Sequence, residues 1–166
     1  LTALGSTMCI VSGSDNQRTY VCFDYEINGV PSGSDPTPLI SAVLAEHGAA
    51  AVELNGLIWA EFSDSAAAVE AAIVSQWRVQ REIKDDARKL RVGVHRGSLN
   101  QTHLVLACAN GNQIVFTQAV DEATGGTLDA RPMQRVALWS ETEPTQLWLS
   151  TDSRPDIDGR PLRVRT

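Results

Sequence analysis

Apolar and polar positions along the chain form short blocks whose spacing alternates between the periods of strands and of helices. Residues 7–11 and 18–27 are rich in β-branched and aromatic side chains, and the polar residues 12–17 between them are turn-forming. This pattern predicts a β-hairpin at the start of the chain.

A loop and a helix are predicted next. Gly, Ser and Pro recur over residues 28–38. Pro36 and Pro38 suit the first turn of a helix, because proline fixes φ and lacks an N–H that the first turn does not pair. We expect the helix to run to about His47, with Gly48 ending it.

A second hairpin is predicted at Asn55-Gly56. Both central residues of a tight two-residue turn need positive φ, and this dipeptide adopts it most readily. Val52 and Leu54 precede the turn, and the apolar-rich residues 57–62 follow it.

The longest predicted helix begins after residues 63–65, whose side chains can cap it. Val69, Ile73, Trp77 and Gln80 recur at helical spacing along it. Its last turns run into the densely charged residues 78–89, which form either a solvated face or a patch that binds a partner.

The remaining elements are short. Strands are predicted at 90–94 and 114–116, with a short helix between them, and a closing hairpin at 134–139 and 146–149. The order of strands and helices predicts an α+β sandwich in which helices pack on a mostly antiparallel sheet.

Two domain-level segments are expected. Residues 1–150 form one domain, and residues 151–166, rich in Asp, Arg, Pro and Gly, form a linker to a further domain or a flexible tail.

The chain has four tryptophans, most of which we expect in the core. Trp139 and Trp148 lie on the two arms of the closing hairpin. An exposed apolar pair that binds a partner is the alternative there.

Composition narrows the class of protein. With 166 residues and 43% hydrophobic side chains, the chain is long enough for one domain with a core. The net charge of -6 and the pI near 5.0 argue against nucleic acid as a partner. No apolar run reaches the roughly 18 residues that span a bilayer, so no membrane is expected as a partner.

The sequence gives little indication of a metal site, a disulfide or a catalytic nucleophile. Cys9, Cys22 and Cys108 lack Cys-x-x-Cys spacing, which predicts reduced thiols in a cytoplasm and neither a disulfide framework nor a zinc site. His95 and His103 have no zinc-type spacing to a third ligand. The chain also lacks a nucleophile elbow and a phosphate-binding P-loop.

Three motifs carry a resemblance to a known family. They are Leu-Arg-Val-Gly-Val-His-Arg-Gly at 90–97, Glu-Leu-Asn-Gly-Leu-Ile-Trp-Ala-Glu-Phe at 53–62, and Ala-Cys-Ala-Asn-Gly-Asn-Gln-Ile-Val-Phe-Thr at 107–117. In this order they resemble the class III nucleotide cyclase domain. The resemblance implies a ferredoxin-like βαββαβ core, and it covers residues 18 to 149.

The resemblance implies where metal ligands should lie. Asp24, after Phe23, matches the first of the family's two metal-binding Asp residues; the alternative is an ordinary strand-end acid. The second Asp should follow Gly in the second hairpin, where this chain has none. Asn55 and Glu53 are the nearest polar residues, and Asn at such a turn typically serves its backbone conformation.

Other family positions have changed. Asn100 matches the Asn that stabilises the transition state, although Ser98-Leu-Asn100 equally suits a helix cap. Leu104 stands where the family has Arg, and leucine cannot donate to a phosphate. The base-recognition Lys falls near Val52 or Glu53.

These losses predict a catalytically inactive cyclase-like domain with a regulatory or interaction role, in a bacterial cytoplasmic protein, with no cofactor. The expected partner is another protein or adjacent domains of a longer chain, since residues 161–163, Pro-Leu-Arg, resemble a linker feature of multidomain regulators. A homodimer is a further alternative.

Two other functions stay open. One is a nucleotide cyclase that makes a cyclic nucleotide from ATP or GTP at an unusual site around Asp24, Glu26 and Asn100, with Mg or Mn. The other is a sensor that binds a nucleotide without turning it over.

Overall fold

A seven-stranded sheet organises the molecule in a computed structural model that describes residues 18–138 and 143–164. Strand order across the sheet is β2-β3-β1-β4-β5-β7-β6. All neighbouring pairs are antiparallel except β4 and β5. The elements are β1 Thr19–Ile27, α1 Thr37–Glu46, β2 Val52–Leu54, β3 Leu57–Phe62, α2 Ser65–Glu82, β4 Arg88–Arg96, α3 Leu99–Cys108, β5 Gln113–Thr117, α4 Gln118–Ala123, β6 Ala130–Val136 and β7 Thr145–Ser150.

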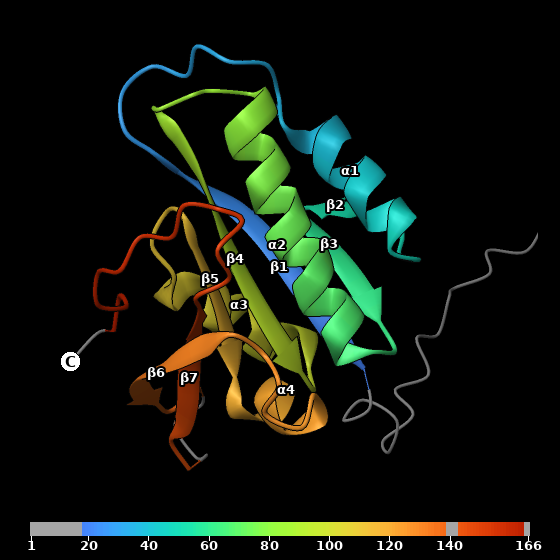
Figure 1. The fold of residues 1–166 in the computed structure, drawn as a ribbon, viewed down its shortest axis with the longest axis vertical. Coiled ribbons are helices and arrows are strands. Elements are labelled where there is room, and N and C mark those ends of the chain that lie inside the picture. Colours follow the sequence, from blue (N-terminus) through green and yellow to red (C-terminus); the bar gives the residue numbers. More distant parts are fainter. Residues whose placement is uncertain (1–17, 139–142, 165–166) are drawn as a thin grey trace, which may run out of the picture.

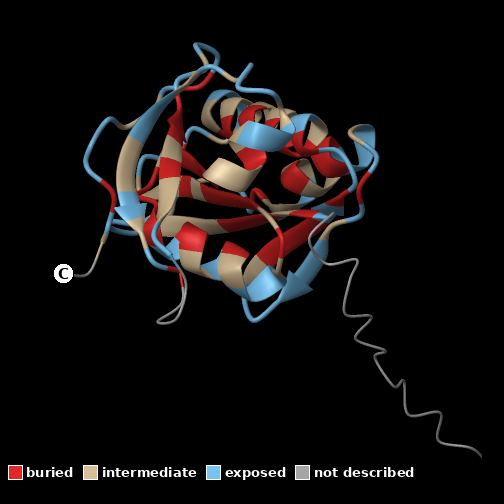
Figure 2. Ribbon diagram, turned by 90° about the horizontal axis from the view of Figure 1, so that it is seen from below, coloured by how far each residue is buried: buried red, intermediate tan, exposed pale blue. Residues whose placement is uncertain are grey.

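Helices cover both faces of the sheet, as Figures 1 and 2 show. α1, α2 and α4 lie on one face, and α3 lies on the other, across β1, β4 and β5. The expected α+β sandwich with a βαββαβ core is confirmed.

The central strands are buried on both sides, which explains their nearly continuous apolar sequences. On β1, Val21 and Phe23 face the main core under α1 and α2, whereas Cys22 between them packs against Leu106 of α3. On β5, Ile114 joins the main core and Val115 faces α3. Figure 2 shows the resulting buried layers between the helices.

Gly93 allows α3 to lie directly on β4. A Cβ at this position would lie 2.6 Å from the backbone nitrogen of Leu106 and 2.8 Å from its Cα. The motif glycine is therefore required for the close approach of helix and strand.

Most of the predicted elements are confirmed. Asp64 caps α2 by accepting from the Ala66 N–H, and Gly48 follows α1 with φ of 84°. Sequence reasoning missed α4, in which only Val120 is buried, so that no apolar period marks it. It also placed the start of β6 four residues late, because the exposed residues at its start have no strand-like alternation.

Three predictions concern residues outside the described part of the chain: the strand at 7–11, Trp139, and Cys9. Trp148 is described, and its indole N–H donates to Gln118 at 2.9 Å while the ring packs against the main core.

Residues 151–164 lie against the domain. Arg154 forms two hydrogen bonds with Glu70 of α2, at 2.6 and 2.8 Å, and Leu162 is 6% exposed. The prediction that 151–166 link this domain to another stays a prediction, since contacts with one domain do not exclude a second.

Candidate functional site

Asp24, the candidate metal ligand, is held by an arginine. β1 and β4 pair so that Asp24 lies directly opposite Arg91, and the Arg91 Nη2 donates to the Asp24 carboxylate at 2.6 Å. Arg91 also donates to the Ala109 carbonyl at 3.4 Å, while its buried Nε has no partner among the described residues. One oxygen of this carboxylate is therefore already paired with a cation.

Glu26 lies on the same face, two residues further along β1. Its carboxylate accepts from the Gly111 N–H at 2.7 Å and from the Arg163 Nη2 at 2.9 Å. The Gly111 hydrogen bond and the nearby Arg163 and Arg160 lower the pKa of Glu26, although burial opposes them. Glu26 is thus a second carboxylate with its charge already compensated.

The β2–β3 turn supplies no second metal ligand beside Asp24. Asn55 and Gly56 have φ of 54° and 75°, as a two-residue hairpin turn requires. Glu53 pairs with Ile58, whose side chain is in the main core on the α1 and α2 side. Paired residues share a face, so Glu53 lies on the opposite face of the sheet from Asp24.

Asn100 lies far from Asp24 in the same chain. It is exposed in the first turn of α3, whereas Arg91, the partner of Asp24, bonds to Ala109 just past the other end of that helix. Cys108 lies eight positions after Asn100, which corresponds to about 12 Å along the helix. The two side chains are not brought together within one chain.

The cap of α3 is Ser98, whose Oγ accepts from the Gln101 N–H at 3.2 Å. The segment from Ser98 to Asn100 therefore begins the helix, and Asn100 itself makes no cap. Leu104, which the resemblance aligns with an Arg, lines an apolar groove with Val136 and Leu138.

The N-terminus of α1 is closed to a phosphate. Pro36 and Pro38 lack N–H groups, and the Thr37 N–H donates to Asp35 at 3.0 Å. Such helix starts bind anions through free N–H groups, and a carboxylate there repels a phosphate.

His95 has a structural role. It is 7% exposed, and its ring nitrogens lie 2.8 Å from the Thr117 Oγ1 and 2.7 Å from the Gln101 Oε1. Burial lowers its pKa, so the neutral ring joins β4, β5 and α3.

The buried thiols are not suited to nucleophilic chemistry. Burial raises the pKa of both Cys22 and Cys108 above its usual range, so neither forms the thiolate that such chemistry needs. Within residues 18–138 and 143–164, no three His, Cys, Asp or Glu side chains are grouped to hold a metal ion. In that same part of the chain, no helix has the length and apolarity to cross a bilayer.

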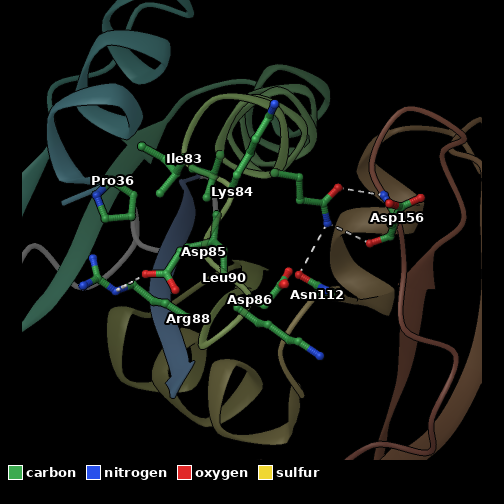
Figure 3. Close-up of a pocket in the computed structure, with 12 residues that line it drawn as sticks. Pro36, Ile83, Lys84, Asp85, Asp86, Arg88, Leu90, Asn112 and Asp156 are labelled. Carbon is green, nitrogen blue, oxygen red and sulfur yellow. Dashed lines mark hydrogen bonds and ion pairs between the residues drawn. The ribbon is translucent and has the colours of Figure 1, made fainter. Parts of the chain in front are cut away.

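A cavity of about 180 Å³ lies at the end of α2 (Figure 3). Its charged lining is balanced between three cations and three carboxylates: Lys84, Arg88, Lys89, Asp85, Asp86 and Asp156. Binding sites for small molecules typically have about 300 Å³ or more. The cavity is therefore too small and too nearly neutral for a nucleoside triphosphate.

Asp85 in this cavity joins two loops. It accepts from the Gly33 N–H at 3.2 Å and from the Ala87 N–H at 3.1 Å. Burial raises its pKa, but these N–H groups and Arg88 outweigh that effect, so the pKa lies below its usual value. Sequence reasoning missed this role, because a charged run gives no signal of which acid is buried.

Solved structures with the same fold are nucleotide cyclases. The adenylyl cyclase CyaB from P. aeruginosa matches with a TM-score of 0.65 and 15% identity, over 85% of this chain and 97% of that one. A Trypanosoma brucei adenylate cyclase in its monomeric state gives 0.66 and 15%, over 94% and 98%. The guanylate cyclase domain of RhGC from Catenaria anguillulae, in complex with GTP, gives 0.60 and 11%, over 81% and 97%.

No family model matches the sequence, and no curated protein does. The structural matches show that the chain has the fold of nucleotide cyclase catalytic domains, which confirms the resemblance that the motifs indicated. At these identities the likeness establishes the fold alone, and function is argued from the site.

Proposed function

We propose that the domain is a catalytically inactive relative of nucleotide cyclases that acts as a regulatory or interaction module. The observation that carries this proposal is the Asp24–Arg91 ion pair at 2.6 Å. Two-metal catalysis needs carboxylates free to bind cations on both reacting oxygens. Here the one matching carboxylate is neutralised, and its counterpart is replaced by the Asn55-Gly56 turn.

The missing cations support the same conclusion. Leu104 replaces the Arg that would stabilise charge on the phosphate, and neither Val52 nor Glu53 can replace the base-recognition Lys. Losing one such electrostatic group typically costs about 3–4 kcal/mol of transition-state stabilisation. Several losses together leave little rate.

The sheet edge offers a surface for a protein partner. β2 is an edge strand, and its Val52 and Leu54 side chains are 56% and 50% exposed on the α3 side of the sheet. Exposed apolar side chains beside an open strand edge favour contact with another protein. The partner is another protein, an adjacent domain or a second copy, and neither nucleic acid nor a membrane.

The dimeric guanylyl cyclase domain of the RhoGC fusion protein from Blastocladiella emersonii has this fold, with a TM-score of 0.61 and 10% identity. This likeness favours a second copy of this chain as one form of the partner.

The test is a thermal-shift titration of the domain with ATP and with GTP, each with and without manganese, followed by a search for cyclic product. A ligand that binds the folded state raises its unfolding temperature in proportion to saturation. We expect no specific shift and no product. Asp24→Ala is expected to change only stability, and Asp129→Ala, at an exposed loop position, is the matched control.

Two results would contradict the proposal. Cyclic product would establish an enzyme. A manganese-dependent shift without product, lost in Asp24→Ala and retained in Asp129→Ala, would establish a nucleotide sensor.

A further inference from the structure

Residues 156–163, here called the strap, cross the surface from α2 to the end of α3. At the start of the strap, the Gln80 side chain of α2 makes two hydrogen bonds with the backbone of Asp156. Its Nε2 donates to the Asp156 carbonyl at 2.9 Å, and its Oε1 accepts from the Asp156 N–H at 2.8 Å (Figure 3). One amide side chain thus binds both backbone polar groups of one strap residue.

Two more amide side chains bind the middle of the strap. The Gln113 Nε2 donates to the carbonyls of Asp158 and Arg160 at 3.0 and 2.8 Å, and the Asn110 Nδ2 donates to the Pro161 carbonyl at 2.9 Å. Both amides are buried, and Gln113 is oriented by accepting from the Asn110 N–H at 2.7 Å. These contacts recognise backbone, whatever side chains the bound peptide has.

Leu162 and Arg163 supply the side-chain contacts. Leu162 packs into an apolar pocket, and Arg163 donates from Nε to Asn110 at 2.9 Å and from Nη2 to Glu26 at 2.9 Å. Leu162 belongs to a buried apolar cluster with residues of α3, β5 and β7, among them Val105, Val115 and Leu147. The Arg163 N–H also donates to the Cys108 carbonyl at 2.8 Å.

Several features favour release of the strap. Leu162 is its one fully buried apolar side chain, and no strap residue pairs within the sheet. The Arg160 and Arg163 side chains are 50% and 49% exposed, so salt screens their ion pairs with Glu26. Segments with few buried apolar side chains open at lower free energy than the core.

We propose that this surface is a binding groove for an extended peptide in which an apolar residue precedes arginine, and that the strap is its releasable intramolecular ligand. Backbone-binding amides give affinity, the Leu162 pocket and Glu26 give specificity, and a partner carrying the same chemistry binds by displacing the strap. The inference rests on these contacts alone and does not depend on whether the domain is catalytic.

The first experiment measures amide hydrogen exchange of the whole chain by NMR. We expect the N–H groups of Asp156, Asp158 and Arg163 to exchange at least about tenfold faster than sheet amides, and faster still at high salt. Arg163→Gln removes a charge-assisted contact and should increase the exchange rate of the strap amides by a further factor of about ten. Arg18→Gln, which breaks the exposed ion pair with Glu61 away from the strap, should leave the exchange rate of the strap amides unchanged.

The second experiment supplies the ligand as a separate peptide with the sequence of residues 155–164. A tethered strap competes at millimolar effective concentration, so the peptide is titrated into the full-length Arg163→Gln chain, in which the strap is weakened. We expect its binding to shift the signals of Gln113 and Asn110. A peptide with L162D and R163E should bind at least about tenfold more weakly.

Two outcomes would overturn the proposal. The first is that the strap amides of the unmodified chain exchange only when the sheet amides do. This would show that the strap is a permanent part of the core. The second is that the strap opens but the chain binds the 155–164 peptide and its L162D, R163E variant equally well. This would show that the groove does not recognise the peptide. Neither readout involves a nucleotide, so failure here is distinguishable from failure of the proposed function.

Discussion

Single residues decide what chemistry this surface can support. Asp24 matches a metal ligand in sequence, but its function depends on which residue stands opposite on β4. Because that residue is Arg91, the carboxylate makes an ion pair across two strands. A one-residue change of register would have placed Leu90 or Val92 there and left the acid free.

Gly93→Ala tests the contact between α3 and β4. Overpacking a close contact typically costs about 1–3 kcal/mol, so we expect the free energy of unfolding in urea to fall by that amount. Adding Leu106→Ala should not restore stability, because the nearest atoms, at 2.6 and 2.8 Å, belong to the Leu106 backbone. Restoration by Leu106→Ala would place the clash in the side chain instead.

His95 makes stability depend on pH. Burial lowers its pKa below the usual 6.5, so the unfolded state binds a proton more readily than the folded state. The free energy of unfolding should therefore fall as the pH drops through about 6.5. Urea unfolding between pH 7.5 and 5 measures this slope, which His95→Gln should reduce.

The control for that slope is His103→Gln, which removes an exposed imidazole. A slope that persists in His95→Gln and disappears in His103→Gln would assign the effect to the surface.

At the scale of elements, local sequence and tertiary contacts agree. The β2–β3 hairpin follows from Asn55-Gly56, and α2 begins where Asp64 can accept from the Ala66 N–H. α4 is the exception. Its six residues show no hydrophobic periodicity, and the helix packs against β4, β5 and β7.

Asn55 should act through its backbone conformation alone. With φ of 54°, Asn55→Gly should leave stability within about 0.5 kcal/mol, and Asn55→Val should cost about 1–2 kcal/mol. Thermal unfolding with and without manganese measures both. A manganese-dependent stabilisation that Asn55→Gly abolishes would identify Asn55 as a ligand and contradict this assignment.

Across the whole molecule, charged contacts hold residues 152–163 to the domain. The pKa values of Glu26 and Glu70, the domain carboxylates that contact this segment, are both lowered, chiefly by the Gly111 N–H for Glu26 and by Arg154 for Glu70. A carboxylate with a lowered pKa adds stability that is present above its unfolded value and is lost as the pH falls through its folded value.

Acid should therefore loosen this segment. Below pH of about 4, we expect the amides of residues 152–163 to lose protection before those of the sheet. Glu70→Gln should weaken protection near Arg154 already at pH 7, whereas Glu61→Gln, on the exposed pair with Arg18, should not. If the amides of residues 152–163 and of the sheet lose protection at the same pH, these contacts do not stabilise the segment separately from the rest of the domain.

Except for α4, the sequence by itself determined the elements and their order, because hydrophobic periodicity, the positions of Pro and Gly, and helix caps all act between near neighbours. The motifs around Gly93 and Gly111 further predicted the cyclase fold.

Only the tertiary structure decided the site. Long-range strand pairing placed Arg91 against Asp24, and folding back of the chain brought Arg163 to Glu26, although the two are 137 positions apart in the sequence. The amides Gln80, Asn110 and Gln113 gave no signal in sequence, since an isolated polar residue does not reveal what backbone it will bind. Contacts between residues far apart in the chain depend on the packed sheet and helices, and no local pattern contains them.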